Sequence, residues 1–168
     1  MQETPQQYTQ RILGYLEGKK ALDILATGPR QVAALIKGVS KKKLAARPAP
    51  DKWSVVEIVA HLADVELVQG YRVRLILGSN GIAIQGFDQD AWARYSDYAK
   101  HDIALSMEAY KVTRERTLRL MKSLPPELWE SYGMHSERGR ETVTRVSEMM
   151  AGHDINHLRQ IRRIVKGE

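Results

Sequence analysis

Four long segments of the sequence repeat apolar residues with the period of an α-helix, and this pattern constrains the fold more than any other feature. They cover about residues 4–26, 54–77, 103–123 and 140–166. No segment alternates apolar and polar residues convincingly, as a half-buried strand does. Helices of this length bury their apolar stripes most simply against one another, so we expect an all-α four-helix bundle.

The second of these helices has the best-marked start in the chain. Ser54 can cap the helix, and Glu57 can reach back to the cap in a capping box. Trp53 and Ile58 flank the cap in the positions of a hydrophobic staple. Asp102 is placed to cap the third helix, because short polar side chains bind the free backbone N–H groups of a first turn.

Glycine and proline mark the expected connections between the helices. The pair Gly28-Pro29 predicts the end of the first helix, with a short helical segment over residues 30–39 after it. The long connection of residues 79–102 predicts a short helix of its own over about 88–95. Connections of this length allow a crossover topology in the bundle.

Composition bounds the class of protein. The chain has 168 residues, 43% of them hydrophobic, so we expect a single domain over residues 1–168. It contains no cysteine, which excludes disulfides, thiolate metal ligands and a cysteine nucleophile. The N-terminal MQETPQQYTQ lacks the regions of a signal peptide, and no window approaches about 18 consecutive apolar residues. We therefore expect a cytoplasmic protein with no membrane partner.

The charge permits an anionic partner without requiring one. The formal net charge is +6 and the pI is about 9.6. Basic residues are scattered along the helices among acidic ones, and no nucleic-acid-binding motif is present. We expect a small-molecule substrate rather than nucleic acid. A basic helical nucleic-acid binder stays open as an alternative, and it would bind with a steep salt dependence.

Three histidines fall on the apolar stripes of two predicted helices. His153 and His157 are four residues apart in MMAGHDINHLRQI, so their imidazoles project from one face of the helix. His61 lies on the stripe of the second helix, within IVAHLADVE. All three side chains are therefore expected to point into the same bundle interior.

Converging imidazoles in an apolar interior are costly when charged or left without partners. A divalent cation removes this cost, because each neutral imidazole offers it a lone pair. Three histidine ligands leave a coordination position open, as in catalytic rather than structural metal sites. The HExxH pattern of zincins is absent, since Asp154 follows His153 and no glutamate lies between the pair.

Two segments resemble the signature regions of a known family. These are RPAPDKWSVVEIVAHLADVE, residues 47–66, and MMAGHDINHLRQI, residues 149–161; GFDQDAWA, residues 86–93, resembles a third recurrent segment. By this resemblance the chain is similar to the DinB/YfiT-like (damage-inducible) superfamily of metalloenzymes over nearly its whole length. The resemblance implies an up-down-down-up bundle and one nickel or zinc ion on His61, His153 and His157. It also implies a homodimer and, in some relatives, a low-molecular-weight thiol cofactor.

Five further polar residues carry open interpretations. Asp64 is placed either to hold an imidazole of the metal site or to pair with an arginine on the helix surface. Asn156 and Gln160 either orient the histidines or line the pocket, or else serve as helix-packing amides. His101 and His135, in predicted connections, are interpreted as solvated loop histidines, with a proton shuttle at the pocket mouth as the alternative.

The function expected from these residues is metal-dependent chemistry on a small molecule. A three-histidine site can activate water for hydrolysis or bind a thiol as thiolate for transfer. We therefore expect an enzyme of the thiol S-transferase or hydrolase type, with catalytic residues other than the metal ligands left unassigned because no carboxylate stands out as a general base. The alternative is a non-catalytic metal-binding stress-response protein, in which a fourth side chain such as Asp64 closes the site.

Overall fold

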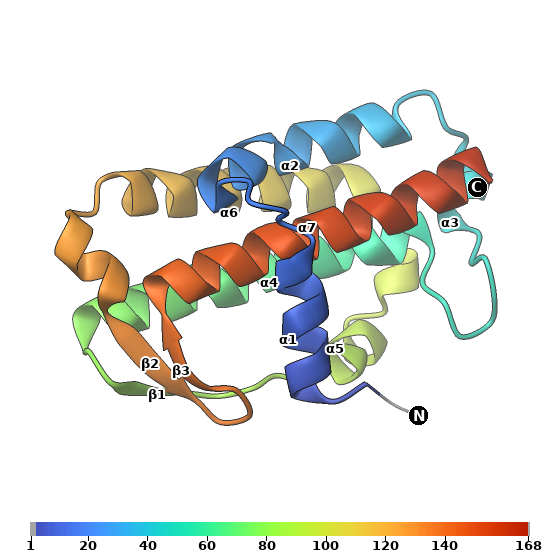
Figure 1. Cartoon of the computed structure of the whole chain (residues 1–168). Coiled ribbons are helices and arrows are strands. Elements are labelled where there is room, and N and C mark those ends of the chain that lie inside the picture. Colours follow the sequence, from blue (N-terminus) through green and yellow to red (C-terminus); the bar gives the residue numbers. More distant parts are fainter. Residues whose placement is uncertain (1–2, 168) are drawn as a thin grey trace.

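Four long helices form the bundle in the computed structural model, which describes residues 3–167 (Figure 1). They are α2 (Ala21–Ile36), α4 (Val55–Gly78), α6 (Ile103–Lys122) and α7 (Val143–Lys166). Around the bundle, α2 packs on α7, α7 on α4, α4 on α6 and α6 on α2. In Figure 1, α2 and α7 run from left to right, whereas α4 and α6 run from right to left, which is an up-down-down-up topology. The predicted four-helix bundle and its topology are confirmed.

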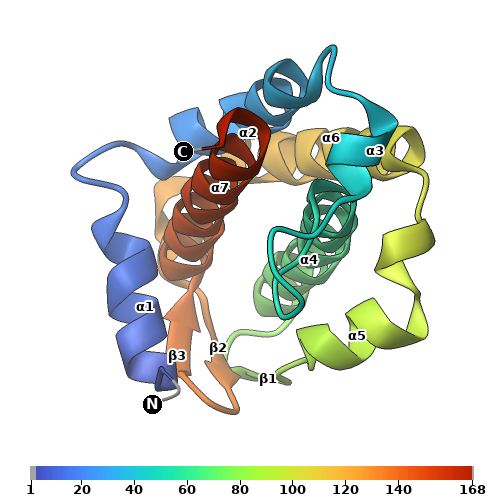
Figure 2. The ribbon, with the colours of Figure 1, turned by 90° about the vertical axis from the view of Figure 1, so that its right-hand side faces the viewer.

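Shorter helices surround this bundle and shape one side of it. They are α1 (Pro5–Gly14), α3 (Lys41–Ala45), α5 (Gln89–Tyr95) and the 3₁₀ turns η1 (Tyr98–Lys100) and η2 (Pro126–Glu130). Helix α1 packs on α7, whereas α5 and η1 contact α4. In Figure 2, α1 and α5 flank the α4–α7 pair on either side of the sheet. The α4–α7 pair is therefore bordered by segments from distant parts of the sequence.

A small sheet covers the same side of the bundle, and the sequence did not predict it. Its strands are β1 (Ile82–Ile84), β2 (Tyr132–His135) and β3 (Gly139–Thr142), with β2 parallel to β1 and antiparallel to β3. Strands of three or four residues are too short for alternation to show in the sequence. The pairing of β1 with β2 also joins segments about 50 residues apart. Gly133 permits this pairing, because an added Cβ would lie 2.3 Å from Ile84 Cδ1.

The predicted helix starts are confirmed with one shift. Ser54 Oγ accepts the Glu57 N–H at 3.3 Å, and Glu57 Oε2 accepts the Ser54 N–H at 2.8 Å, which completes the capping box of α4. Asp102 caps α6 as expected. The last helix begins at Val143 rather than near residue 140, because residues 139–142 are used by β3 and Thr142 provides the cap.

The break expected at Gly28-Pro29 was wrong. The chain turns instead between α1 and α2, at Glu17 and Gly18, both with positive φ angles of 50° and 76°, and Pro29 lies inside α2. Proline has no N–H for the carbonyl four residues earlier, which here belongs to Leu25. Arg114 Nη1 donates to that carbonyl at 3.0 Å. A tertiary hydrogen bond thus replaces the one that the helix loses.

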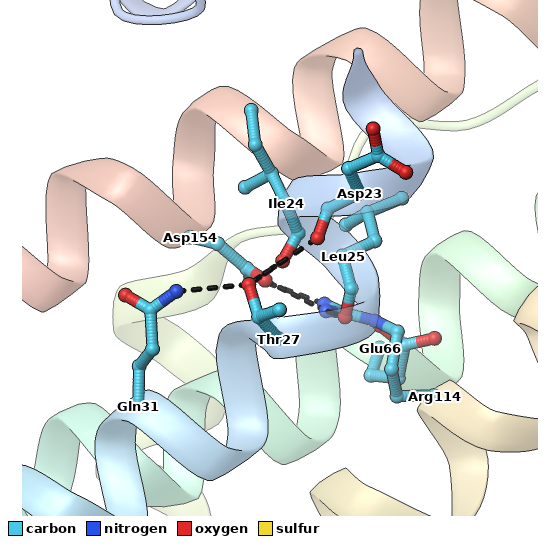
Figure 3. A network of polar contacts seen from close by, with 8 residues as sticks. All are labelled: Asp23, Ile24, Leu25, Thr27, Gln31, Glu66, Arg114 and Asp154. Atoms are coloured by element: carbon cyan, nitrogen blue, oxygen red, sulfur yellow. Dashed lines mark hydrogen bonds and ion pairs between the residues drawn. The ribbon is translucent and has the colours of Figure 1, made fainter. Parts of the chain in front are cut away.

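Arg114 joins all four bundle helices at this point (Figure 3). Its Nε donates to Glu66 of α4 at 2.7 Å, and its Nη1 and Nη2 donate to the two oxygens of Asp154 of α7 at 2.6 and 3.1 Å. All three side chains are at most 4% exposed. Gly28 lets α2 approach this cluster, because an added Cβ would lie 2.4 Å from Asp154 Oδ2.

The charged cluster separates two apolar cores. One core lies at the sheet end of the bundle and includes Val73, Met121 and Val146; the other lies at the opposite end and includes Val59 and Ile161. On α4, α6 and α7 the residue of the charged cluster falls between the residues of the two cores in sequence. No helix within residues 3–167 is both long and apolar enough to cross a membrane.

We predict that Gly28→Ala lowers the free energy of unfolding by about 2 kcal/mol or more. The new methyl group displaces the Asp154 carboxylate and weakens a buried, charge-assisted contact, which outweighs the gain of ~1 kcal/mol for alanine in a helix. Gly14→Ala is the matched control, since nothing lies within 4 Å of an added Cβ there. Urea unfolding of both variants tests this, and equal stabilities would contradict the account.

Candidate metal centre

The three predicted histidines meet between α4 and α7. The Nε2 atom of His153 lies 3.1 Å from His61 Nε2 and 3.0 Å from His157 Nε2. One ligand atom from each ring lies within 4.8 Å of the other two. The exposed fractions of the residues are 1%, 9% and 6% for His61, His153 and His157. The expected convergence of these side chains from two helices is confirmed.

The charged cluster fixes the helices that carry the histidines. Asp154 directly follows His153, so its two bonds to Arg114 set the rotation of α7 about its own axis. Glu66 lies five residues after His61 on α4 and binds the same guanidinium. A rotation of either helix that moved an imidazole would break a buried ion pair, which is strongly unfavourable.

Burial keeps these imidazoles neutral. It lowers the pKa of His61 and of His157 well below the usual value near 6.5, and the neighbouring histidines lower both further. Burial lowers the pKa of His153 to about 4, with the charge of Arg114 as the second cause. Neutral imidazole is the form that binds a metal ion, so the site is prepared for a cation at neutral pH.

The hydrogen bonds show which lone pairs are free. Gln160 Oε1 lies 2.8 Å from His157 Nδ1 and so accepts its proton, which leaves a lone pair on His157 Nε2. His153 Nε2 can donate to only one of its two neighbours. The Nδ1 atom of His61 is buried and has no partner among the described residues. Three ring nitrogens therefore face one another with too few protons to pair them.

A divalent cation fits this donor set. Imidazole nitrogens bind zinc at about 2.0–2.1 Å, which places tetrahedral ligand atoms about 3.3 Å apart. The two Nε2–Nε2 separations of 3.0 and 3.1 Å differ from that by only a few tenths of an ångström. The spacing, the burial and the shortage of protons all agree with one ion bound by His61, His153 and His157.

Asp64 does not close the site. The Tyr98 hydroxyl donates to Asp64 Oδ2 at 2.5 Å, so Asp64 neither holds an imidazole nor pairs with an arginine, and both predicted roles were wrong. Trp53 packs on the ring of His61, with a centroid separation of 4.8 Å, and covers it from the linker side. The fourth position of a tetrahedral ion is thus not taken by these neighbouring side chains.

A cavity of about 700 Å³ reaches two of the three histidines, His153 and His157. It is lined by His153, His157, Asn156 and Gln160 of α7, and its far walls come from α1, α5 and the linker before α4. Arg11 of α1 donates to Asn156 Oδ1 at 3.2 Å, so Asn156 serves the wall of the cavity rather than a histidine. The contact of Gln160 with His157 confirms the interpretation that an amide orients one of the histidines.

The two remaining histidines have different positions. The Nε2 atom of His101 lies 2.9 Å from the Ser96 carbonyl, in the connection after α5. His135 was expected to be a solvated loop residue, which was wrong, because it lies on β2 and is 3% exposed. It lines a second cavity of about 310 Å³ that also reaches His153. The contributions of His135 and Arg11 were missed because they depend on the sheet and on the docking of α1.

Comparison with known families decides the membership. The family model described as the DinB superfamily matches residues 24–161, which is most of the chain and includes all three histidines. The chain belongs to the DinB superfamily. The expected resemblance is confirmed, and the three converging histidines are this DinB protein's candidate metal ligands.

Several known proteins that are similar to this DinB protein are named as metal-dependent hydrolases. A protein of Oceanobacillus iheyensis named "Putative metal-dependent hydrolase" is 26% identical over 68% of this chain and 66% of its own length. A protein of Bacillus mycoides with the same kind of name is 24% identical over 79% of this chain and 76% of its own. The solved structure described as "YfiT from Bacillus subtilis is a probable metal-dependent hydrolase with an unusual four-helix bundle topology" superimposes with a TM-score of 0.82 at 20% identity. It covers 88% of this chain and 85% of that one, which confirms the fold.

We predict that the metal-free DinB protein loses stability as the pH falls from about 6.5 to about 4. In this window the unfolded chain binds more protons than the folded one, because burial lowers the pKa of His153 to about 4. His153 alone accounts for a loss of ~2 kcal/mol between pH 7 and pH 5. Urea unfolding of chelator-treated protein at both pH values measures it. His153→Asn should reduce the difference by that amount, and an unchanged difference would contradict the prediction.

Proposed function

We propose that His61, His153 and His157 bind one zinc or nickel ion and that the protein is a metal-dependent hydrolase of a small-molecule substrate. The observation that carries the proposal is the convergence of the Nε2 atoms of three neutral imidazoles beside a cavity of about 700 Å³. A site with three protein ligands and an accessible fourth position is the catalytic rather than the structural type. The names of the relatives, "Putative metal-dependent hydrolase", support the same reaction class.

The chain supplies binding and orientation to this chemistry. A divalent ion supplies Lewis acidity and brings the pKa of a bound water near neutrality. Gln160 holds the ring of His157 in the tautomer that presents Nε2 to the site. Trp53 covers His61 and keeps water from that side of the imidazole, which strengthens electrostatic interactions within the site. The charged side chains that line the cavity largely offset one another, because Arg11 pairs with Glu3 and Lys52 pairs with Asp51.

Thiol S-transfer is the second candidate function. The cavity that reaches His153 and His157 could also admit a low-molecular-weight thiol, whose sulfur a bound divalent ion would hold as thiolate. The two reactions differ in their requirements. A hydrolase acts on esters or amides without added thiol, whereas a transferase needs both a thiol and an electrophile. We favour hydrolysis because the names of the relatives specify it.

A non-catalytic metal-binding or stress-response role is the alternative from another class. It would be favoured by a fourth side chain that completes the ligand set. Asp64 was the candidate for that position, and its bond to the Tyr98 hydroxyl speaks against it. A homodimer, a cytoplasmic location and the lack of a nucleic-acid partner stay predictions from the sequence.

We predict that protein purified without a nickel column binds one equivalent of zinc or nickel, and that His153→Ala retains less than about a tenth of it. Gln160→Ala should weaken the affinity by about 10- to 100-fold, because the orientation of His157 is lost. His101→Ala is the matched control and should bind metal like the wild type. Elemental mass spectrometry and chelator competition measure these values.

Activity is tested on the same variants. The zinc- and nickel-loaded proteins are assayed with a panel of esters and amides, and separately with low-molecular-weight thiols and an electrophile. Turnover that needs metal and disappears in His153→Ala is the expected result. Failure of the wild type to bind zinc or nickel after reconstitution would contradict the proposal, and full metal binding without turnover in either panel would favour the non-catalytic alternative.

A further inference from the structure

The smaller cavity beside the histidines has features of a site in its own right. Its volume is about 310 Å³, and it meets the larger cavity at His153. Part of its wall is apolar, from Val65, Phe87 and Met149. Its polar wall includes Arg72 of α4, which faces the side of the bundle covered by the sheet. A volume near 300 Å³ lies at the lower end of the range for small-molecule sites.

Arg72 is a buried cation without a carboxylate partner. It is 4% exposed, and its Nη2 donates to the Gln85 carbonyl at 2.7 Å. No carboxylate of residues 3–167 lies within ion-pair distance of it. The Cζ atom of Arg72 lies 5.8 Å from the centroid of the Phe87 ring. Burial lowers the pKa of Arg72 to about 10, followed in effect by the charge of Arg138, so the side chain is still charged at neutral pH.

The acidic residues around the cavity are engaged elsewhere or exposed. Glu141 accepts two bonds from Arg138, at 2.7 and 3.0 Å. Glu3 accepts two bonds from Arg11, both at 2.8 Å. Glu137 lies on the exposed turn between β2 and β3. Burying a charge is costly unless it is paired, so Arg72 marks a position where an anion would be stabilised.

His135 adds a second donor to the same cavity. Its Nδ1 accepts the N–H of Glu137 at 3.1 Å, so the proton of the neutral ring is on Nε2. That Nε2 is buried and has no partner among the described residues. A buried donor without an acceptor is rare in proteins and costs about 1–3 kcal/mol. An oxygen ligand in the cavity would satisfy it.

We infer that this cavity binds a carboxylate of the substrate, with Arg72 and the Nε2–H of His135 as its donors. The inference rests on the proposed function, since it names the substrate class of the same site. The planar guanidinium matches the geometry of a carboxylate, and Val65, Phe87 and Met149 contact a short aliphatic chain. Because His153 borders both cavities, the substrate carboxylate lies in the smaller one while the reacting group lies at the histidines.

The test compares propionate with its neutral analogue propionamide by NMR titration of the zinc-loaded and the metal-free protein. We expect propionate to bind the wild type at least tenfold more tightly than propionamide in both forms. Arg72→Gln should abolish this preference, and Arg72→Lys should reduce it. Arg74→Gln is the matched control, because Arg74 lies on the same helix, is exposed and donates only to the Gly70 carbonyl.

Each outcome has a distinct meaning. Equal affinities of the wild type for propionate and propionamide would overturn the inference without use of any variant. Equal losses in Arg72→Gln and Arg74→Gln would also overturn it. Propionate binding that requires zinc and ignores Arg72 would place the carboxylate at the histidines, which contradicts the inference and leaves the proposed function intact. Arg72-dependent binding in a protein that takes up no zinc would support the carboxylate site and contradict the proposed metal-dependent function.

Discussion

Arg114 donates to Glu66, to Asp154 and to the carbonyl of Leu25, and through these bonds one guanidinium of α6 contacts the other three bundle helices. Removing one partner from such a cluster leaves a buried charge unpaired, which costs about 3–5 kcal/mol. The cluster therefore specifies which helix faces meet, in addition to the two apolar cores on either side of it. Its position beside His153 means that the same contacts fix the candidate metal ligands.

The positions of the three histidines depend on the contacts of Arg114 with Glu66 and Asp154. The rotation of α7 set by Asp154 brings His153 opposite His61, and the helical period then places His157 one turn further. Gln160 accepts the Nδ1 proton of His157 and so fixes the tautomer of that ring. The outer segments α1, α5 and the sheet lie around the α4–α7 pair (Figure 2). Residues of these segments line the two cavities that reach His153.

The sequence predicted those features that depend on local pattern, including the helices α4, α6 and α7, the α4 capping box and the convergence of His61, His153 and His157. It misplaced the features that depend on partners far away in the chain. Pro29 was predicted to end a helix, because the residue that replaces its missing hydrogen bond to Leu25, Arg114, lies 85 residues further along the chain. His135 was predicted to be a loop residue, because its burial depends on strand pairing, which cannot be predicted from segments of three and four residues.

The most direct test of the account is a crystal structure of the zinc-loaded protein with anomalous diffraction at the zinc edge. The account predicts one strong peak between α4 and α7, bonded to the Nε2 atoms of His61, His153 and His157. At least one further ligand would be a water or a small molecule in the larger cavity. A peak bound elsewhere, or one whose fourth ligand is a protein side chain, would contradict the claim that these helices are held together to present an open three-histidine site.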